Sequence, residues 1–386
     1  MGPPLRALAL ASVPVAKAYS IPCAIRSLIA PSHTVMRPRS FALPVLVLHV
    51  IARPAVAQWT AQSSGTAVEL RGLSAVSPSV AWGSGQSGTV IRTTDGGRTW
   101  MAGTVADART LDLRAIAAIS ASTAFAMSIG DSSRIFRTTD GGRSWSLRFT
   151  STRKGSFMDA IRFWDARHGM AVSDPVDGKF LVVTTSDGGE TWKETPAAGM
   201  QPALPNEGAF AASGSCLAVW GRGDAWFVTG GASVARVFHS KDFGMHWVAF
   251  DSPIRAGSAS EGIFSVAFRD AKHGVISGGD YRQAALGGRN VALTHDGGRT
   301  WTLVDSARSP QGFRSAVVFV PGTNGRELVA VGLNGTDRSR DGGLSWTATD
   351  SVPYNSLQFG GRTGFVVGPK GRAASAAFTV HVAPRR

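Results

Sequence analysis

The sequence has little of several features that mark other classes of protein. Its 386 residues include two cysteines, Cys23 and Cys216, which is too few for a disulfide framework. Outside the N-terminal region no apolar run is long enough for a membrane span, and no long window has the period of an amphipathic helix. Nucleotide fingerprints, haem motifs and metal-ligand clusters are missing, so we predict no cofactor. The 46 glycines, short apolar runs and frequent turn residues predict an all-β fold.

The first 57 residues differ from the rest of the chain, because they hold six basic residues and no acidic one. Met36 begins a basic segment, an apolar run over 41–48 follows, and Ala55-Val56-Ala57 has the small residues of a cleavage site. We expect residues 1–57 to be a signal peptide cleaved after Ala57, with Met36 as a candidate true start. Export to the periplasm or the extracellular space follows. The alternative is a membrane anchor, which needs a longer and less interrupted apolar run.

Loss of this leader changes the charge and the cysteine content. The net charge of +14 falls to +8 when six basic residues are removed, which suits an exported protein near anionic surfaces. No nucleic-acid-binding motif accompanies the charge, so we expect no nucleic-acid partner. Cys216 remains alone, so the mature chain has no intrachain disulfide, and its neighbours predict a buried structural thiol. We also expect no transmembrane segment in the mature chain, and a monomer.

Six copies of one phrase, Ser/Thr-x-Asp-x-Gly-x-x-Trp, recur between residues 93 and 346. Their aspartates are Asp95, Asp140, Asp187, Asp242, Asp296 and Asp341. The spacings of 45, 47, 55, 54 and 45 residues indicate repeated supersecondary units. Extended runs flank each copy, so the phrase is predicted to be the turn of a β-hairpin.

The phrase has the composition of a turn that satisfies its own hydrogen bonds. The hydroxyl and the carboxylate can accept hydrogen bonds from turn N–H groups, the second glycine predicts a positive φ, and the tryptophan gives a small sheet a large side chain to bury. A repeated aspartate is also a candidate metal ligand or catalytic group, but we interpret all six as structural. The copy at 240–247 has Phe243 and His246 at substituted positions, so its turn is expected to deviate most.

The phrase is the Asp-box, or BNR, repeat, and residues 58–380 resemble proteins that carry it. The resemblance implies a β-propeller with the box between the third and fourth strands of each blade. Seven strand openings accompany the six boxes, and residues 58–62 resemble a strand that follows a box. We therefore predict one all-β domain over residues 58–386: a seven-bladed β-propeller of four-stranded antiparallel blades, with an N-terminal strand that closes the last blade.

Each repeat unit opens with a strand that carries a polar residue near its start. These residues are Arg71, Arg114, Asp159, Glu207, Glu261, Arg314 and Asn355. The resemblance implies that they surround one mouth of the central channel, with a basic and an acidic half. Such a ring predicts a site for a polar or zwitterionic ligand or peptide, and the alternative is that the charges pair and stabilise ring closure. The longest loops over this mouth add the candidates Asp174, Asp177, Asp280, Tyr281 and Arg282, unless those loops are only tolerated insertions.

The repeat pattern is similar to the photosystem II stability/assembly factor-like family of exported seven-bladed propellers. Members act through protein surfaces. The resemblance implies a non-catalytic binding or assembly protein whose polar channel mouth meets a protein partner or a small polar or carbohydrate ligand. The pattern does not identify that partner.

The alternative is a glycoside hydrolase, either sialidase-like or of the polysaccharide-cleaving Asp-box type. Arg71, Arg114 and Arg314 could mimic the sialidase arginine triad, with Tyr354 as nucleophile and Glu261 as its partner. Against this, the early Arg-Ile-Pro signature is absent, sialidases are typically six-bladed, and the three arginines fall in neighbouring blades. A two-carboxylate mechanism needs acids about 5–9 Å apart, which the three acidic openings could supply. We therefore predict a protein that is not an enzyme, with a glycosidase as the alternative.

Overall fold

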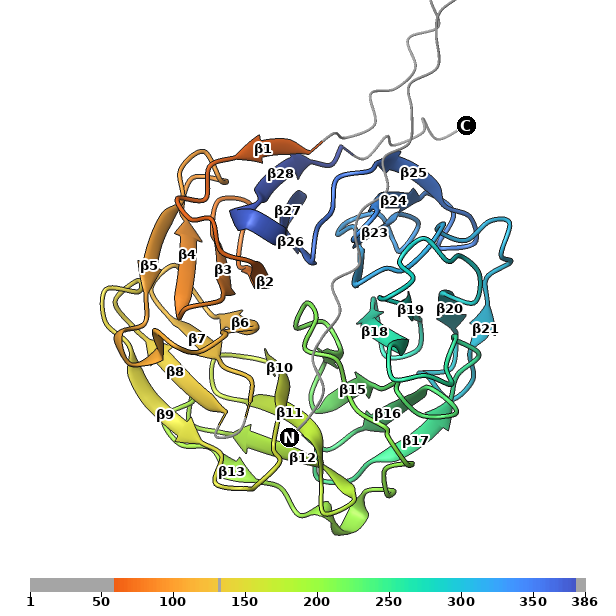
Figure 1. Cartoon of the computed structure of the whole chain (residues 1–386), viewed down its shortest axis with the longest axis horizontal. Helices are drawn as coiled ribbons and strands as arrows, with labels where there is room; N and C mark the ends of the chain where they lie inside the picture. The colour runs from red at the N-terminus through yellow and green to blue at the C-terminus, as the bar shows by residue number, and fades with distance from the viewer. Residues whose placement is uncertain (1–58, 131–132, 380–386) are drawn as a thin grey trace, which may run out of the picture. The chain divides into compact units, whose positions relative to one another are not determined.

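Seven four-stranded antiparallel sheets make up the part of the chain that the computed structural model describes, residues 59–130 and 133–379. These residues belong to one unit, residues 54–386, in which the sheets surround a central axis as blades (Figure 1). The predicted all-β class, the seven blades and their four-stranded antiparallel sheets are confirmed. The expected signal peptide, residues 1–57, lies outside the described residues.

Six blades are built from four consecutive strands each. Blade 1 contains β2 (Leu70–Ala75), β3 (Ala81–Gly85), β4 (Thr89–Thr93) and β5 (Met101–Thr104). Blade 2 contains β6 (Ala115–Ala118), β7 (Ala124–Met127), β8 (Arg134–Thr138) and β9 (Ser146–Thr150). Blade 3 contains β10 (Met158–Phe163), β11 (Gly169–Val176), β12 (Lys179–Thr185) and β13 (Lys193–Glu194).

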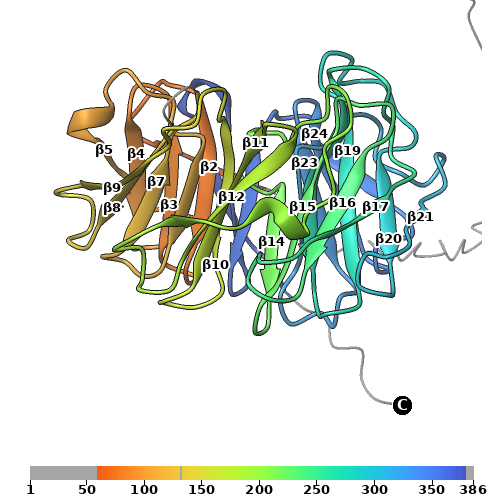
Figure 2. The ribbon, with the colours of Figure 1, turned by 90° about the horizontal axis from the view of Figure 1, so that it is seen from below.

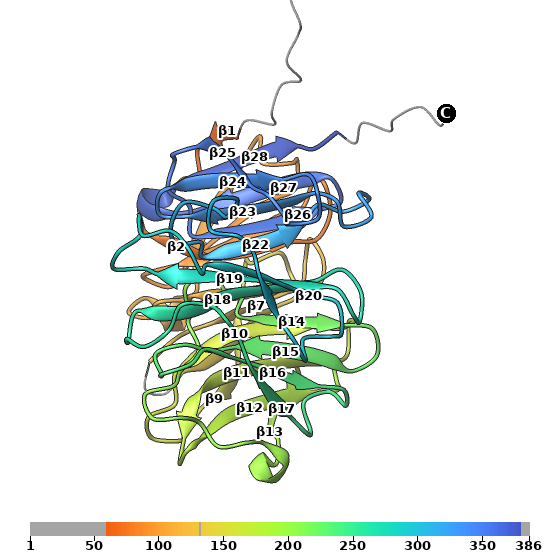
Figure 3. The same ribbon diagram turned by 90° about the vertical axis from the view of Figure 1, so that its right-hand side faces the viewer.

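The next three blades repeat this order. Blade 4 contains β14 (Leu217–Trp220), β15 (Asp224–Val228), β16 (Arg236–Ser240) and β17 (Val248–Asp251). Blade 5 contains β18 (Glu261–Phe268), β19 (Gly274–Asp280), β20 (Val291–Thr294) and β21 (Thr302–Leu303). Blade 6 contains β22 (Ala316–Phe319), β23 (Leu328–Gly332), β24 (Gly335–Ser339) and β25 (Thr347–Asp350). In Figure 3 the strands of blades 6 and 7 lie at the top of the view, and those of blade 5 and then blade 4 lie below them.

Blade 7 draws its strands from both ends of the described chain. Its order is β26 (Ser356–Gly360), β27 (Thr363–Val367), β28 (Ala373–Ala377) and β1 (Thr60–Gln62), with Thr60 opposite Ser375 (Figure 1). The Trp59 ring packs edge-on against Tyr354, 6.1 Å between centroids. The first strand of the described segment, β1, thus pairs antiparallel with its last strand, β28, so the two ends of the segment meet in one blade.

Helical structure among the described residues is limited to three short 3₁₀ turns: η1 (Ala106–Ala108), η2 (Ala197–Gly199) and η3 (Pro369–Gly371). None of the described helices has the length and apolar character of a membrane span.

The core lies between neighbouring blades, because each middle strand is covered on both faces. Trp82 of β3 and Phe136 of β8 belong to one apolar cluster between blades 1 and 2. Leu70 of β2 and Phe365 of β27 belong to another, between blades 1 and 7. Strands covered on both faces read as continuous apolar runs rather than as alternating patterns, as β7 (Ala-Phe-Ala-Met) does.

The Asp boxes connect the third and fourth strands. In blade 1, Thr93 Oγ1 donates to Asp95 Oδ1 (2.9 Å) and accepts from the Gly97 N–H (2.8 Å). Asp95 accepts from the N–H (2.9 Å) and the hydroxyl (2.7 Å) of Thr99, and these bonds lower the pKa of Asp95 to about 2. The second glycine of all six boxes has a φ between 75° and 95°, as predicted. The Asp-box carboxylate therefore accepts hydrogen bonds from its own turn and has a structural role.

The box of blade 4 keeps this geometry despite its substitutions. Phe243 replaces the first glycine at a φ of 60°, and its ring packs against Trp164 at 5.0 Å. His246 Nδ1 lies 2.6 Å from Asp242 Oδ2, where other boxes have a hydroxyl. The expectation that this turn deviates most is wrong, because the imidazole occupies the position of the hydroxyl.

Candidate functional site at the channel mouth

The inner strands of the blades begin at one end of the channel, and the Asp boxes lie at the opposite end, because the strands alternate in direction (Figure 2). In blades 1, 3 and 5 the inner strand carries a β-bulge near its start. The extra residues are Arg71, Asp159 and Phe264. A bulge re-aims the side chain of its extra residue, and bulges are frequent beside functional sites.

Residues 209–215 of blade 4 leave their sheet and enter the ring; we call this segment the plug. It begins after Gly208, which pairs with Gly230 at the mouth end, and ends before β14, and the green segment at the centre of Figure 1 follows this path. The plug residues Ser213 and Ser215 are almost fully buried. The blade 4 sheet therefore contributes a stretch of chain to the centre of the ring.

Hydrogen bonds fasten the plug to the inner strands of other blades. Ser213 Oγ donates to the carbonyl of Ser315 before β22 (2.8 Å), and Ser356 Oγ of β26 donates to the carbonyl of Ser213 (3.0 Å). Ser215 Oγ donates to Ser265 Oγ of β18 (2.9 Å). Blades 5, 6 and 7 thus hold the plug inside the ring.

A cavity of about 290 Å³ lies between the plug and the channel mouth; we call it the mouth pocket. Its polar lining residues are Arg71, Arg114, Ser315 and Asn355. Its apolar wall consists of Phe157, Ala209, Phe210, Ala211, Ala212, Phe264, Tyr281, Phe313 and Leu333. The Phe210 and Phe264 rings stack at 3.9 Å, and Phe313 meets Phe264 edge-on at 4.7 Å. The pocket therefore combines two cations with an aromatic wall.

Both arginines of the mouth pocket have partners on their own blades. Arg71 pairs with Glu69 at 2.8 Å, and Arg114 pairs with Asp112 at 2.8 Å. Their side chains keep 24% and 29% of their exposure. Burial lowers the pKa of Arg71, and the charge of Arg114 adds to that effect while Glu69 opposes it. Two neighbouring, partly exposed cations can still accept an anionic group.

The other charged openings do not line the mouth pocket. Glu207 is buried, receives hydrogen bonds from Thr229 Oγ1 (2.7 Å) and the Leu204 N–H (2.8 Å), and forms an ion pair with Arg236. Among the described residues, the ion-pair partner of Glu261 is Arg255, at a long distance of 3.9 Å, and Glu261 does not line the pocket.

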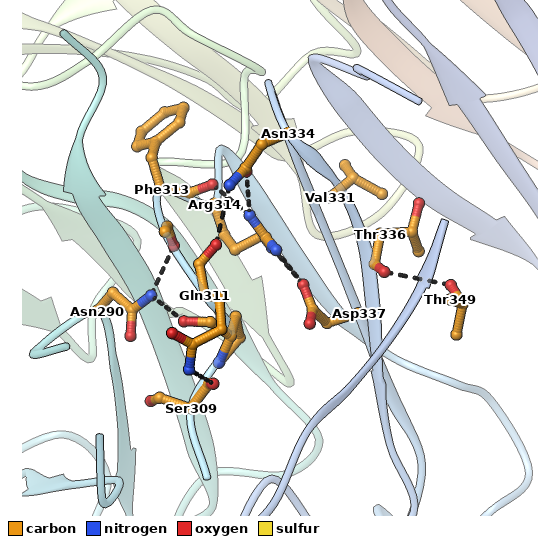
Figure 4. A network of polar contacts seen from close by, with 12 residues as sticks. Asn290, Ser309, Gln311, Phe313, Arg314, Val331, Asn334, Thr336, Asp337 and Thr349 are labelled. Atoms are coloured by element: carbon orange, nitrogen blue, oxygen red, sulfur yellow. Dashed lines mark hydrogen bonds and ion pairs between the residues drawn. The ribbon is translucent and has the colours of Figure 1, made fainter. Parts of the chain in front are cut away.

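Arg314 is also withdrawn from the mouth pocket. Its guanidinium forms a buried ion pair with Asp337 and donates to the Phe313 carbonyl (2.8 Å) and to Asn334 (Figure 4). Asn355 remains at the pocket and donates to the carbonyl of Leu70 (2.9 Å). Of the seven strand openings predicted to surround the mouth, Arg71, Arg114 and Asn355 line the pocket. None of the three acidic openings lines it.

Asp159 and Asp174 form a pair of carboxyl groups beside the plug. Asp159 is fully buried, and neither of its oxygens has a hydrogen-bond partner among the described residues. Burial and the charge of Asp174 raise the pKa of Asp159 well above its usual range. Burial also raises the pKa of Asp174 to about 6, although it accepts a hydrogen bond from the N–H of Ala209 (2.8 Å). Asp174 thus binds Ala209, the first residue of the plug, beside a second carboxyl group whose charged form is disfavoured.

The loop candidates are distributed differently from the prediction. Tyr281 lines the mouth pocket, and the Arg282 guanidinium lies 6.0 Å from its ring centroid. Asp280 is buried and accepts from the Arg282 N–H (2.9 Å). Asp177 is exposed and pairs with Arg153 at 2.6 Å. The described residues contain no group of three or more side chains able to hold a metal ion.

The phenylalanines of the apolar wall are the part of the site that the sequence analysis did not select. Phe157 lies two residues before Asp159, Phe313 directly precedes Arg314, and Phe264 follows the Glu261 opening. An aromatic residue beside a strand opening is the signal that could have found them.

A family model described as photosynthesis system II assembly factor YCF48 matches residues 51–156. No curated protein matches the sequence. Among solved structures, YCF48 bound to a D1 peptide has a TM-score of 0.61 and 18% identity, covering 83% of this chain and 97% of that one. YCF48 from Cyanidioschyzon merolae has a TM-score of 0.59 and 19% identity, covering 83% and 98%.

A GH74 xyloglucanase from Xanthomonas campestris also shares the fold, with a TM-score of 0.57 and 16% identity. The match covers 85% of this chain and 55% of the xyloglucanase. These low identities establish the fold and not the activity. The chain is therefore a seven-bladed BNR-type β-propeller that resembles the photosystem II assembly factor YCF48.

Proposed function

We propose that the chain is an exported, non-catalytic binding or assembly protein that holds a segment of a partner protein in the mouth pocket. The segment is apolar and carries a carboxylate. The observation that carries this proposal is the placement of Arg71 and Arg114 beside the stacked Phe210 and Phe264 rings. Arginine forks recognise carboxylates, and a closed aromatic wall takes apolar side chains.

The chemistry of the pocket lining supports binding rather than turnover. None of the residues that line the mouth pocket is a carboxylate. Glycoside hydrolysis needs two carboxyl groups that flank one bond of the substrate. Of the acidic openings, Glu207 is committed to Arg236, and Asp159 is fully buried.

The nature of the ligand is supported by the relatives as well. YCF48 has been solved with a D1 peptide, and this chain has the same fold. We propose that this chain also binds a peptide, and we do not propose that the peptide is the same one.

A glycoside hydrolase remains the second candidate. The pKa of Asp174, raised to about 6 by burial, is one that a general acid can use, and the xyloglucanase shares the fold. Xyloglucan and sialoside hydrolysis by the purified protein decides this point. If the protein hydrolyses either substrate and Asp174→Asn abolishes that activity, the glycoside hydrolase is favoured over the binding protein.

An array of immobilised peptides tests the binding proposal. The peptides combine aromatic or aliphatic residues with Asp or Glu, and each has a matched Asn or Gln version. We expect selected acidic peptides to bind the wild type and not the Arg71→Glu/Arg114→Glu variant. Arg222→Glu is the matched control, because Arg222 is exposed and lies outside the pocket lining. Equal binding of acidic and amide peptides, or equal binding by the double variant, contradicts the proposal.

Export is part of the proposal and has its own measurement. N-terminal sequencing of the protein recovered from the producing cells should begin at Gln58. A cytosolic protein that retains the basic leader contradicts it.

A further inference from the structure

A second cavity, of about 320 Å³, lies at the other end of the same inner strands; we call it the far-end cavity. Its lining includes Ser74 of β2, Arg162 of β10 and Gln358 of β26. Ser74 comes three residues after Arg71, and Gln358 three residues after Asn355. Three residues of extended chain span about 10 Å. The far-end cavity and the mouth pocket share no lining residue, so they are separate cavities.

Arg162 is half-buried and differs from the three buried arginines of the described chain. Arg236, Arg314 and Arg338 are buried, and each forms an ion pair with a carboxylate. Arg162 forms no ion pair with a described residue. Its Nη1 donates a hydrogen bond to the carbonyl of the neighbouring Ile161 (3.2 Å). Burial lowers the pKa of Arg162 to about 10, and no carboxylate offsets that effect. A cation partly removed from water without a counter-charge favours the approach of an anion.

The neighbouring polar groups of the far-end cavity are hydrogen-bond donors. Ser74 Oγ accepts from the Ala118 N–H (3.0 Å), which leaves its hydroxyl proton free for a ligand. Gln358 lines the same cavity, and its side-chain amide has no hydrogen-bond partner among the described residues. Arginine, hydroxyl and amide N–H groups from three blades together suit an oxyanion.

One acidic residue also lines the far-end cavity. Asp165 pairs with His168 Nδ1 at 2.9 Å and accepts from the Arg167 N–H (2.7 Å), so its carboxylate is engaged by its own turn. Its side chain is 55% exposed, so solvent and salt screen its charge. Asp165 therefore repels an anion less than a buried, unpaired carboxylate would.

We propose that the far-end cavity is a binding site for one compact oxyanion, a carboxylate or a phosphate, held by Arg162 with Ser74 and Gln358. The site is separate from the mouth pocket and lies on the Asp-box side of the plug. It adds a small-anion ligand to a protein whose mouth is proposed to take a peptide.

Isothermal titration of the mature protein tests this site with inorganic phosphate and with acetate, in separate arms at constant ionic strength. We expect saturable binding of at least one anion to the wild type, and the arm that binds identifies the chemical source. Arg162→Gln should weaken binding by about ten-fold or more, the loss expected for a charge-assisted pair. Arg167→Gln, an exposed arginine on the following turn, should bind as the wild type does.

Further variants keep the test independent of folding and of the mouth pocket. Ser74→Ala and Gln358→Leu should each weaken binding while retaining the circular dichroism spectrum of the wild type. Arg162→Gln should weaken anion binding to the same extent in an Arg71→Glu/Arg114→Glu background, in which the mouth pocket has lost its two cations. The proposal is overturned if neither anion gives saturable binding to the wild type, or if a folded Arg162→Gln protein binds as tightly as the wild type.

Discussion

Removal of the Glu207 carboxylate should destabilise the propeller strongly. Its partner Arg236 is 8% exposed and lies on β16. Glu207→Ala would leave that guanidinium buried and unpaired, and would also strip an acceptor from Thr229 Oγ1 and from the Leu204 N–H. Breaking a buried ion pair by removing one partner costs about 3–5 kcal/mol of unfolding free energy.

Two comparisons separate this cost from a general effect of charge removal. Asp177→Ala breaks the exposed pair with Arg153, whose side chain is 42% exposed, and should cost less than about 1 kcal/mol. The double variant Glu207→Met/Arg236→Met removes both charges and should cost less than Glu207→Ala, because no unpaired charge remains.

Urea titrations followed by tryptophan fluorescence measure all three variants. If Glu207→Ala costs no more than Asp177→Ala, Glu207 is not buried in an ion pair. The assignment of Glu207 to the scaffold rather than to a site would then be refuted.

Three further predictions concern individual carboxylates and the thiol. Asp296→Ala should cost about 1–3 kcal/mol, because Thr300 loses the acceptor for its N–H and its hydroxyl. The wild-type pKa of Asp296 is lowered to about 2, so this cost should be present above about pH 4 and shrink toward pH 2 in urea titrations; a constant cost argues against it. The pKa of Asp174 is raised to about 6, so the wild type should lose stability relative to Asp174→Asn as the pH rises from about 4 through 6, and an opposite slope contradicts the assignment. Cys216 is buried with a raised pKa, so iodoacetamide should label it only after unfolding, as mass spectrometry would show, and rapid labelling of the native protein contradicts that burial.

Local chemistry made the scaffold predictable from the sequence. Each Asp box forms its hydrogen bonds within a few residues, so its turn, its positive φ and its spacing could be read directly. Six blades followed from that spacing, and the seventh from the seven strand openings that the spacing brought into register. The prediction for the blade 4 box was wrong because the imidazole of His246 contacts the Asp242 carboxylate where the other boxes use a hydroxyl.

The candidate site was less predictable, because its side chains depend on partners far along the chain. Arg236, the partner of Glu207, and Asp337, the partner of Arg314, lie on third strands and belong to no repeated motif. The bulges that aim Arg71 and Phe264 depend on strand register rather than on composition. The long spacing of 55 residues before the blade 4 box is consistent with extra chain in that unit, but a spacing does not say that the extra chain enters the channel.

The most direct test of the central claim is calorimetry of an array-selected acidic peptide with the wild type, Arg114→Glu and Arg222→Glu. Binding through the mouth pocket predicts that Arg114→Glu weakens affinity by about ten-fold or more, that Arg222→Glu does not, and that added salt weakens wild-type binding. Equal affinities for all three proteins would place the ligand elsewhere and contradict the account.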